Sequence, residues 1–166
     1  MKRAPVLFAA IAGLFLPWQA RAADPALVAR AMEVVQICAA HIPDFRAARA
    51  AVEEAGFRSE GTDGVYHWFT ERNRVLVGIT ATQAPYAGCG VTMNRLSVQE
   101  ARAAVQAFLP SDTALEIPLE GRRRVPDALW GAVIAGKPMW IAIEDRIDTG
   151  LTRGAFILVL PVEERG

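Results

Sequence analysis

The sequence predicts an α+β fold, with one largely antiparallel sheet of about six strands and two to three helices on one face of it. Segments with apolar residues at three- and four-residue steps, typical of helices, alternate with segments rich in β-branched and aromatic residues, typical of strands. Short turns join neighbouring strands, as in antiparallel pairs. The order helix, strand, turn, strand, loop, strand occurs twice, over 43–94 and 97–162, which suggests a duplicated αβββ unit.

The first 22 residues have the organisation of a cleavable secretory signal peptide. A short basic region, Lys2 and Arg3, precedes an apolar stretch shorter than the roughly 20 residues that span a bilayer. Ala20 and Ala22 are small residues at the two positions that a signal peptidase recognises. We therefore expect residues 1–22 to be removed.

The remaining chain, residues 23–166, has the length of a single α+β domain. We expect it to be periplasmic or secreted, with no stable membrane insertion after cleavage; the alternative, an uncleaved anchor, is disfavoured by Pro17. Loss of the first 22 residues would leave 15 basic and 18 acidic side chains, a net charge near −3. Such a charge gives no basis for binding nucleic acid.

Cys38 and Cys89 are the two cysteines of the chain. In an oxidising compartment two thiols are expected to form a disulfide where the geometry allows it. A redox-active pair and half of a metal site are the alternatives, but a redox pair usually has the spacing Cys-x-x-Cys, and no histidines cluster with these thiols. We predict a structural disulfide and no metal site.

Three helices are predicted from their start and stop signals. Asp24-Pro25 and Pro43-Asp44 each place a capping side chain and a proline at a helix start, and Ser97 with Glu100 forms a capping box. The helices should end near Ala40, at Gly56 and at Leu109.

Six strands are predicted, and the run 156–160 should be an interior strand because it is apolar at every position. Residues 111–126 should hold at most one short strand, near 115–119. The six strands are expected at 65–70, 74–82, 88–94, 128–134, 138–145 and 154–162.

Aromatic residues offer one candidate binding surface. Tyr66 and Trp68 alternate along a strand and share one of its faces. If that face is exposed, with Trp130 or Trp140 beside them, the rings would suit a protein partner, a sugar or a lipid. The alternative is that these rings belong to the core.

A basic run, Arg122, Arg123 and Arg124, lies in the least regular segment of the sequence. Three adjacent cations can attract an acidic partner or phosphate head groups, whereas a short run in a net-acidic protein is more often a solvated loop.

The segment 144–148 contains the acids Asp145 and Asp148, which are the candidates for carboxylate chemistry. Asp148-Thr149-Gly150 resembles the tripeptide of retropepsin-like aspartic proteases, in which paired carboxylates activate water. The resemblance covers only these three residues, and Asp-Thr-Gly is also ordinary turn chemistry between two strands.

We expect a non-enzymatic binding or interaction module of the bacterial cell envelope. Its partner would be another envelope protein or a small apolar or glycan ligand, and no cofactor is expected because the motifs of cofactor binding are missing from the sequence. The alternative is a small envelope hydrolase that uses the carboxylates of the 144–148 loop.

Overall fold

A computed structural model describes residues 22–80, 87–119, 126–148 and 153–162, with the side chains of 146–148 outside the description. Three helices and eight strands follow one another along the chain in the order α1 (Pro25–His41), α2 (Phe45–Glu54), β1 (Arg58–Thr62), β2 (Tyr66–Glu71), β3 (Val75–Thr80), β4 (Cys89–Met93), α3 (Val98–Phe108), β5 (Ala114–Glu116), β6 (Ala128–Ile134), β7 (Lys137–Asp148) and β8 (Arg153–Pro161).

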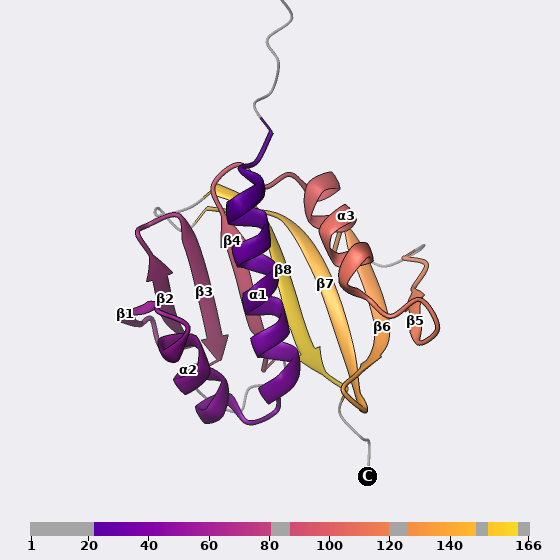
Figure 1. The fold of residues 1–166 in the computed structure, drawn as a ribbon, viewed down its shortest axis with the longest axis horizontal. Helices are drawn as coiled ribbons and strands as arrows, with labels where there is room; N and C mark the ends of the chain where they lie inside the picture. Colours follow the sequence, from indigo (N-terminus) through magenta and orange to yellow (C-terminus); the bar gives the residue numbers. More distant parts are fainter. Residues whose placement is uncertain (1–21, 81–86, 120–125, 149–152, 163–166) are drawn as a thin grey trace, which may run out of the picture.

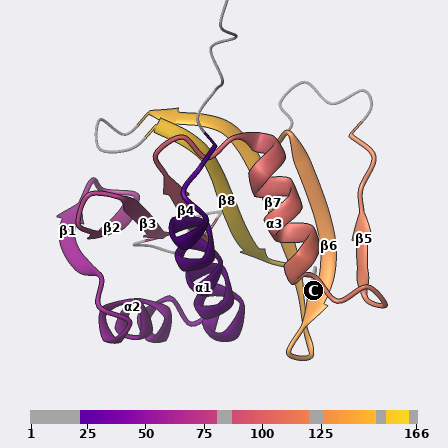
Figure 2. The same cartoon turned by 45° about the horizontal axis from the view of Figure 1, so that its top comes forward.

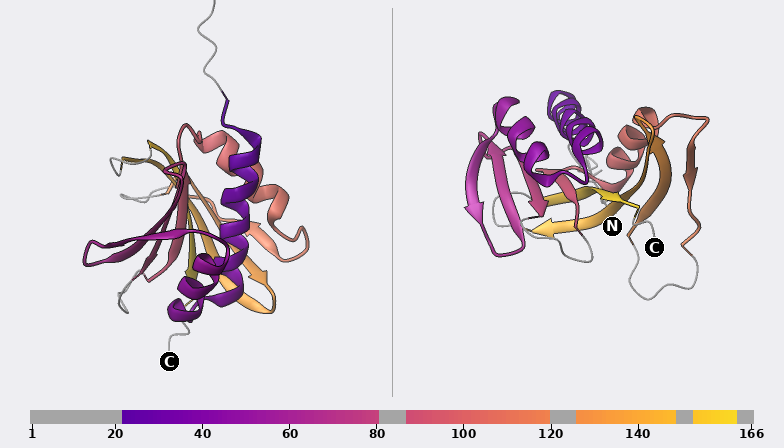
Figure 3. Two further views of the ribbon diagram at one scale, coloured as in Figure 1. Left: turned by 60° about the vertical axis from the view of Figure 1, so that its left-hand side comes forward. Right: turned by 90° about the horizontal axis from the view of Figure 1, so that it is seen from below.

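The eight strands form one sheet in the order β1-β2-β3-β4-β8-β7-β6-β5, and all neighbouring strands are antiparallel. Figure 1 shows α1 crossing the middle of the sheet, with α2 and α3 to either side of it. Seen from below, in the right panel of Figure 3, the three helices lie on the same side of the sheet. The predicted α+β class is therefore confirmed.

The predicted number of strands is wrong, because the sheet has eight strands rather than about six. β1 was missed since all five of its residues are exposed and show no apolar alternation. β5 has only three residues, within the segment where one short strand was expected. Both lie at the edges of the sheet, and neither buries a side chain, so they leave no apolar alternation in the sequence.

The three helix starts follow the predicted capping chemistry. The carboxylate of Asp24 accepts a hydrogen bond from the amide of Ala26, and the carboxylate of Asp44 does the same near the start of α2. Ser97 and Glu100 form the complete capping box of α3. These side chains satisfy amides that have no partner inside the helix, which fixes where each helix begins.

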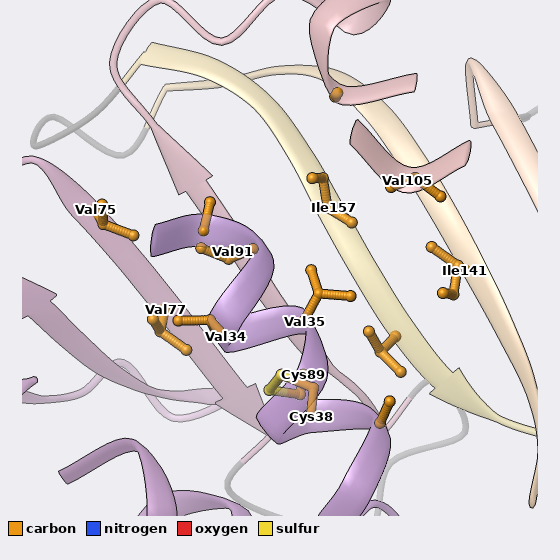
Figure 4. Close-up of a cluster of buried hydrophobic side chains, with 14 of the residues drawn as sticks. Val34, Val35, Cys38, Val75, Val77, Cys89, Val91, Val105, Ile141 and Ile157 are labelled. Carbon is orange, nitrogen blue, oxygen red and sulfur yellow. A yellow bond between two sulfur atoms is a disulfide. The ribbon is translucent and has the colours of Figure 1, made fainter. Parts of the chain in front are cut away.

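The main core lies between the helices and one face of the sheet. Val34 and Val35 of α1 are fully buried, and in Figure 4 they lie over Val91 of β4 and Ile157 of β8. The interior position of β8, between β4 and β7, matches the prediction made from its continuous apolar run.

Cys38 and Cys89 form the predicted disulfide, with their Cα atoms 5.7 Å apart and both side chains buried. The bond joins the last turn of α1 to β4, as Figure 4 shows. Disulfides persist in oxidising compartments and are rare in the reducing cytoplasm. The bond therefore indicates a location outside the cytoplasm.

We predict that replacing both cysteines with alanine lowers the free energy of unfolding by up to about 4 kcal/mol, because a loop of this length is constrained in the unfolded chain. Urea denaturation of the oxidised protein and the double variant measures the difference, and thiol titration of the unreduced protein should find no free thiol. Two free thiols in that titration would contradict the disulfide.

Candidate functional site

The face of the sheet opposite the three helices carries a second, smaller apolar cluster. Its buried members are Ala142 of β7 and Phe156 and Leu158 of β8, with Leu129 and Leu160 packed against them. No helix of the described chain covers this surface, which we call the helix-free face. Within the described residues, these side chains are covered by those of the neighbouring strands.

Glycines allow large rings to lie against the backbone on the helix-free face. Gly78 of β3 and Gly90 of β4 are direct cross-strand partners. A Cβ atom on Gly78 would lie 2.7 Å from Cζ3 of Trp68, and one on Gly90 would overlap the ring of Phe156. Two aromatic rings from the neighbouring strands β2 and β8 therefore cover this pair of glycines.

A second row of residues crosses the other half of the helix-free face. Leu115 of β5, Gly131 of β6, Trp140 of β7 and Leu160 of β8 are consecutive cross-strand partners. The Trp140 ring lies over Gly131, where a Cβ atom would be 3.1 Å from Cζ3 of the indole.

Several apolar side chains in this row or next to it are exposed to water. Leu115 is 68% exposed, and Val133, which shares the face, is 43% exposed. We call the apolar side chains of this region the open-face patch; its members are Leu115, Val133, Pro138, Trp140 and Leu160. Single exposed apolar residues are common, but a contiguous group on an open sheet face is typical of an interaction surface.

At the opposite end of the face, Tyr66 and Trp68 are half-buried, with ring centroids 5.3 Å apart. The indole nitrogen of Trp68 donates to Asp63 at 2.8 Å, and the same carboxylate accepts from the amides of Val65 and Tyr66. The hydrogen bond from the Tyr66 amide, then that from Trp68, lowers the pKa of Asp63. Because its N–H is used within the hairpin, Trp68 offers a partner only its ring.

The structure separates the four aromatic residues of the predicted surface. Tyr66, Trp68 and Trp140 share the helix-free face, but four strand spacings, about 19 Å, separate β2 from β7. Trp130 lies on the opposite face, where it is 3% exposed and the guanidinium of Arg102 lies 5.9 Å from its ring. Trp130 is therefore a core residue and not part of this surface.

The basic run Arg122, Arg123 and Arg124 lies outside the described residues. Asp145 lines a cavity of about 520 Å³ together with Arg95, Ser97 and Arg153. The amide of Asp145 donates to the Asp127 carboxylate at 2.6 Å.

Asp148 pairs with Arg153 in the ladder between β7 and β8, and its side chain lies outside the description. The structure thus places one of the two predicted carboxylates. Within the described ranges, no three His, Cys, Asp or Glu side chains are grouped to hold a metal ion.

Comparisons with protein-family models, with curated proteins and with solved structures found no match to this chain. The helices among the described residues are too short or too polar to cross a membrane.

The sequence contained an unused signal for the helix-free face. Gly78, Gly90 and Gly131 interrupt segments that otherwise have strong strand patterns, and a glycine inside a strand often marks the close approach of another group. Which group approaches depends on strand pairing, so only the structure identifies the rings.

We predict that Gly78→Ala lowers the free energy of unfolding by about 1–3 kcal/mol, because the new methyl group overlaps the Trp68 ring. The penalty should fall markedly when Trp68 is replaced by alanine, and a double-mutant cycle by urea denaturation measures this coupling. Gly131→Ala, with its longer contact, is the milder comparison. Additive effects of the Gly78 and Trp68 substitutions would show that the ring does not lie on Gly78.

We predict that acid weakens the hydrogen bonds that Asp63 accepts from Trp68 and from the amides of Val65 and Tyr66. Its folded-state pKa lies below the ordinary value, so its stabilising contribution is complete above that ordinary value and is lost as the pH falls through the folded-state pKa. The indole N–H resonance of Trp68 should shift in this acidic range in the wild type and stay constant in Asp63→Asn. An equal shift in both proteins would assign the change to another group.

Proposed function

We propose that this chain is a non-enzymatic interaction module of the cell envelope that binds another protein through the open-face patch and the edge strand β5. The main support for this proposal is that Leu115 and Val133 are exposed on a sheet face that no described helix covers. Leu115 belongs to β5, the last strand of the sheet, and Val133 belongs to its neighbour β6; both strands lie at one edge of the sheet (Figure 2).

The two edges of the sheet differ in how well they resist pairing with another chain. β1 carries the charged residues Arg58 and Glu60 and has an irregular register between Ser59 and Gly61. Charges and bulges of this kind hinder edge-to-edge pairing. β5 carries one charged residue, Glu116, which is paired with Arg102, and it presents the exposed apolar side chain of Leu115. Its outer side pairs with no strand of the described chain.

An extended segment of a partner protein suits this edge. Its backbone would pair with β5, and the side chain next to Leu115 would pack on it. The part of the partner that continues over the helix-free face would cover Val133 and Trp140. Main-chain hydrogen bonds would supply affinity, and the apolar side chains would select the partner sequence. This is why we favour a protein over a small apolar or glycan ligand.

The location is part of the same proposal. The disulfide indicates a compartment outside the cytoplasm, and the organisation of residues 1–22 favours export to the periplasm or secretion. A partner in the same envelope compartment would meet the folded, oxidised protein.

We predict that Leu115→Arg reduces capture of the partner at least roughly tenfold. The substitution removes a central apolar contact and would bury an unpaired charge in the interface. The oxidised protein of residues 23–166 is the bait, in an envelope extract of the native host, and the retained proteins are quantified by mass spectrometry. Val65→Arg is the matched control, since Val65 is an aliphatic residue that is 51% exposed at the far end of the face.

Unchanged capture by Leu115→Arg, or equal losses in both variants, would contradict the proposal. Native mass spectrometry of the purified protein shows whether it carries a small ligand instead of a protein partner. A bound small molecule that Leu115→Arg releases, without any retained protein, would overturn the choice of a protein partner.

We also propose that the two halves of the chain derive from one duplicated unit, with four strands rather than the three predicted. α2 precedes β1–β4 and α3 precedes β5–β8, and the equivalent strands β4 and β8 are neighbours in the sheet. Both halves have a tight turn with positive φ between their second and third strands, at Arg72-Asn73 and Ala135-Gly136.

A further inference from the structure

Ala23, the residue that follows the predicted cleavage point, is held inside the fold. Only 8% of it is exposed, and it belongs to the main core cluster, whereas Ala22 is exposed. Its backbone nitrogen donates a hydrogen bond to Oε1 of Glu100 at 2.8 Å. This contact joins residues 77 positions apart, at the start of α1 and the first turn of α3.

The two carboxylate oxygens of Glu100 have separate partners. Oε2 accepts from the backbone nitrogen of Ser97 at 3.0 Å, and the Glu100 amide donates to the Ser97 hydroxyl at 3.2 Å; these two bonds form the capping box of α3. The Ser97 hydroxyl also donates to Oε2 at 2.6 Å. Oε1 accepts from Ala23. The hydrogen bond from the Ser97 hydroxyl, together with those from the Ser97 and Ala23 amides, lowers the pKa of Glu100. The group that faces Ala23 is therefore a carboxylate anion at neutral pH.

We propose that hydrolysis of the Ala22–Ala23 bond creates an N-terminal ammonium group that pairs with Glu100, so that Glu100 is the binding site of the mature N-terminus. Water adds across the peptide bond during export: the C–N bond breaks, Ala22 leaves as a carboxylate, and Ala23 keeps the nitrogen as a protonated amine. The position that donates one neutral N–H before cleavage then carries a full positive charge and three N–H groups.

The surroundings make Glu100 the important counter-charge. A neighbouring cavity of about 990 Å³ is lined by Ala23, Asp24, Arg74, Arg95 and Arg153, so three cations and one further carboxylate share a cavity with the new N-terminus. The Asp24 carboxylate accepts from the amide of Ala26 in the cap of α1. An opposite charge at hydrogen-bond distance favours the charged form of the amine, whereas the nearby guanidinium groups oppose it.

The pairing would connect cleavage with the completed fold. α1 begins at Pro25, two residues after the new N-terminus, and it carries Cys38 across the centre of the sheet. An ion pair between Ala23 and Glu100 would fix the start of α1 to the start of α3. A chain with extra residues before Ala23 would lack that charge at this position.

The test uses protein exported and processed by its native host, with the pKa of the N-terminal amine measured by NMR after ¹³C reductive methylation. Glu100→Gln removes the charge but keeps an acceptor for the capping box, in which Gln replaces Glu. Glu54→Gln, at the exposed end of α2, is the matched control.

We expect intact-mass analysis to find Ala23 at the N-terminus. The pKa of its amine should lie above the ordinary range of about 7.7–8.0 and about one unit above that of Glu100→Gln, with Glu54→Gln unchanged. A different N-terminus overturns the proposal, as does an equal pKa in the wild type and Glu100→Gln. If Glu100→Gln fails to fold, a wild-type pKa equal to that of a peptide of residues 23–30 overturns it.

Discussion

The disulfide and the buried valines of α1 attach this helix to β4 at the centre of the sheet. β4 lies between β3 and β8 and is where the two halves of the sheet meet. The Cys38–Cys89 bond fixes the end of α1 to this strand, and the fully buried Val34 and Val35 continue the contact along the helix. A constrained loop loses less entropy on folding. The position of the helix over the centre of the sheet is thus secured by both covalent and apolar contacts.

The three helices lie on one face of the sheet, and in the described part of the chain the other face is covered by strand side chains alone. In the middle of that face the glycines accept the rings of Trp68 and Phe156, and burial is nearly complete around β4 and β8. Toward β5 this protection ends, and Leu115 and Val133 remain exposed. The region near β5 is therefore the part of this face that its own side chains leave exposed and that a partner can cover.

Local chemistry was predictable from the sequence, and long-range pairing was not. Asp24, Asp44 and Ser97 mark the helix starts because a cap acts on amides two or three residues away. The disulfide followed from the number of cysteines and the expected compartment. By contrast, which of Trp130 and Trp140 faces the helices depends on the register of β6 and β7. One step along a strand reverses the face, so the sequence alone did not show that Trp130 lies in the core.

Photo-crosslinking in the living host can detect a protein bound to β5 and the open-face patch. A photoreactive amino acid is placed at position 115 in one strain and at position 65, the distant exposed aliphatic site, in another. We expect one envelope protein to be crosslinked from position 115 and none from position 65. No adduct at position 115, or the same adducts from both positions, would contradict the proposal.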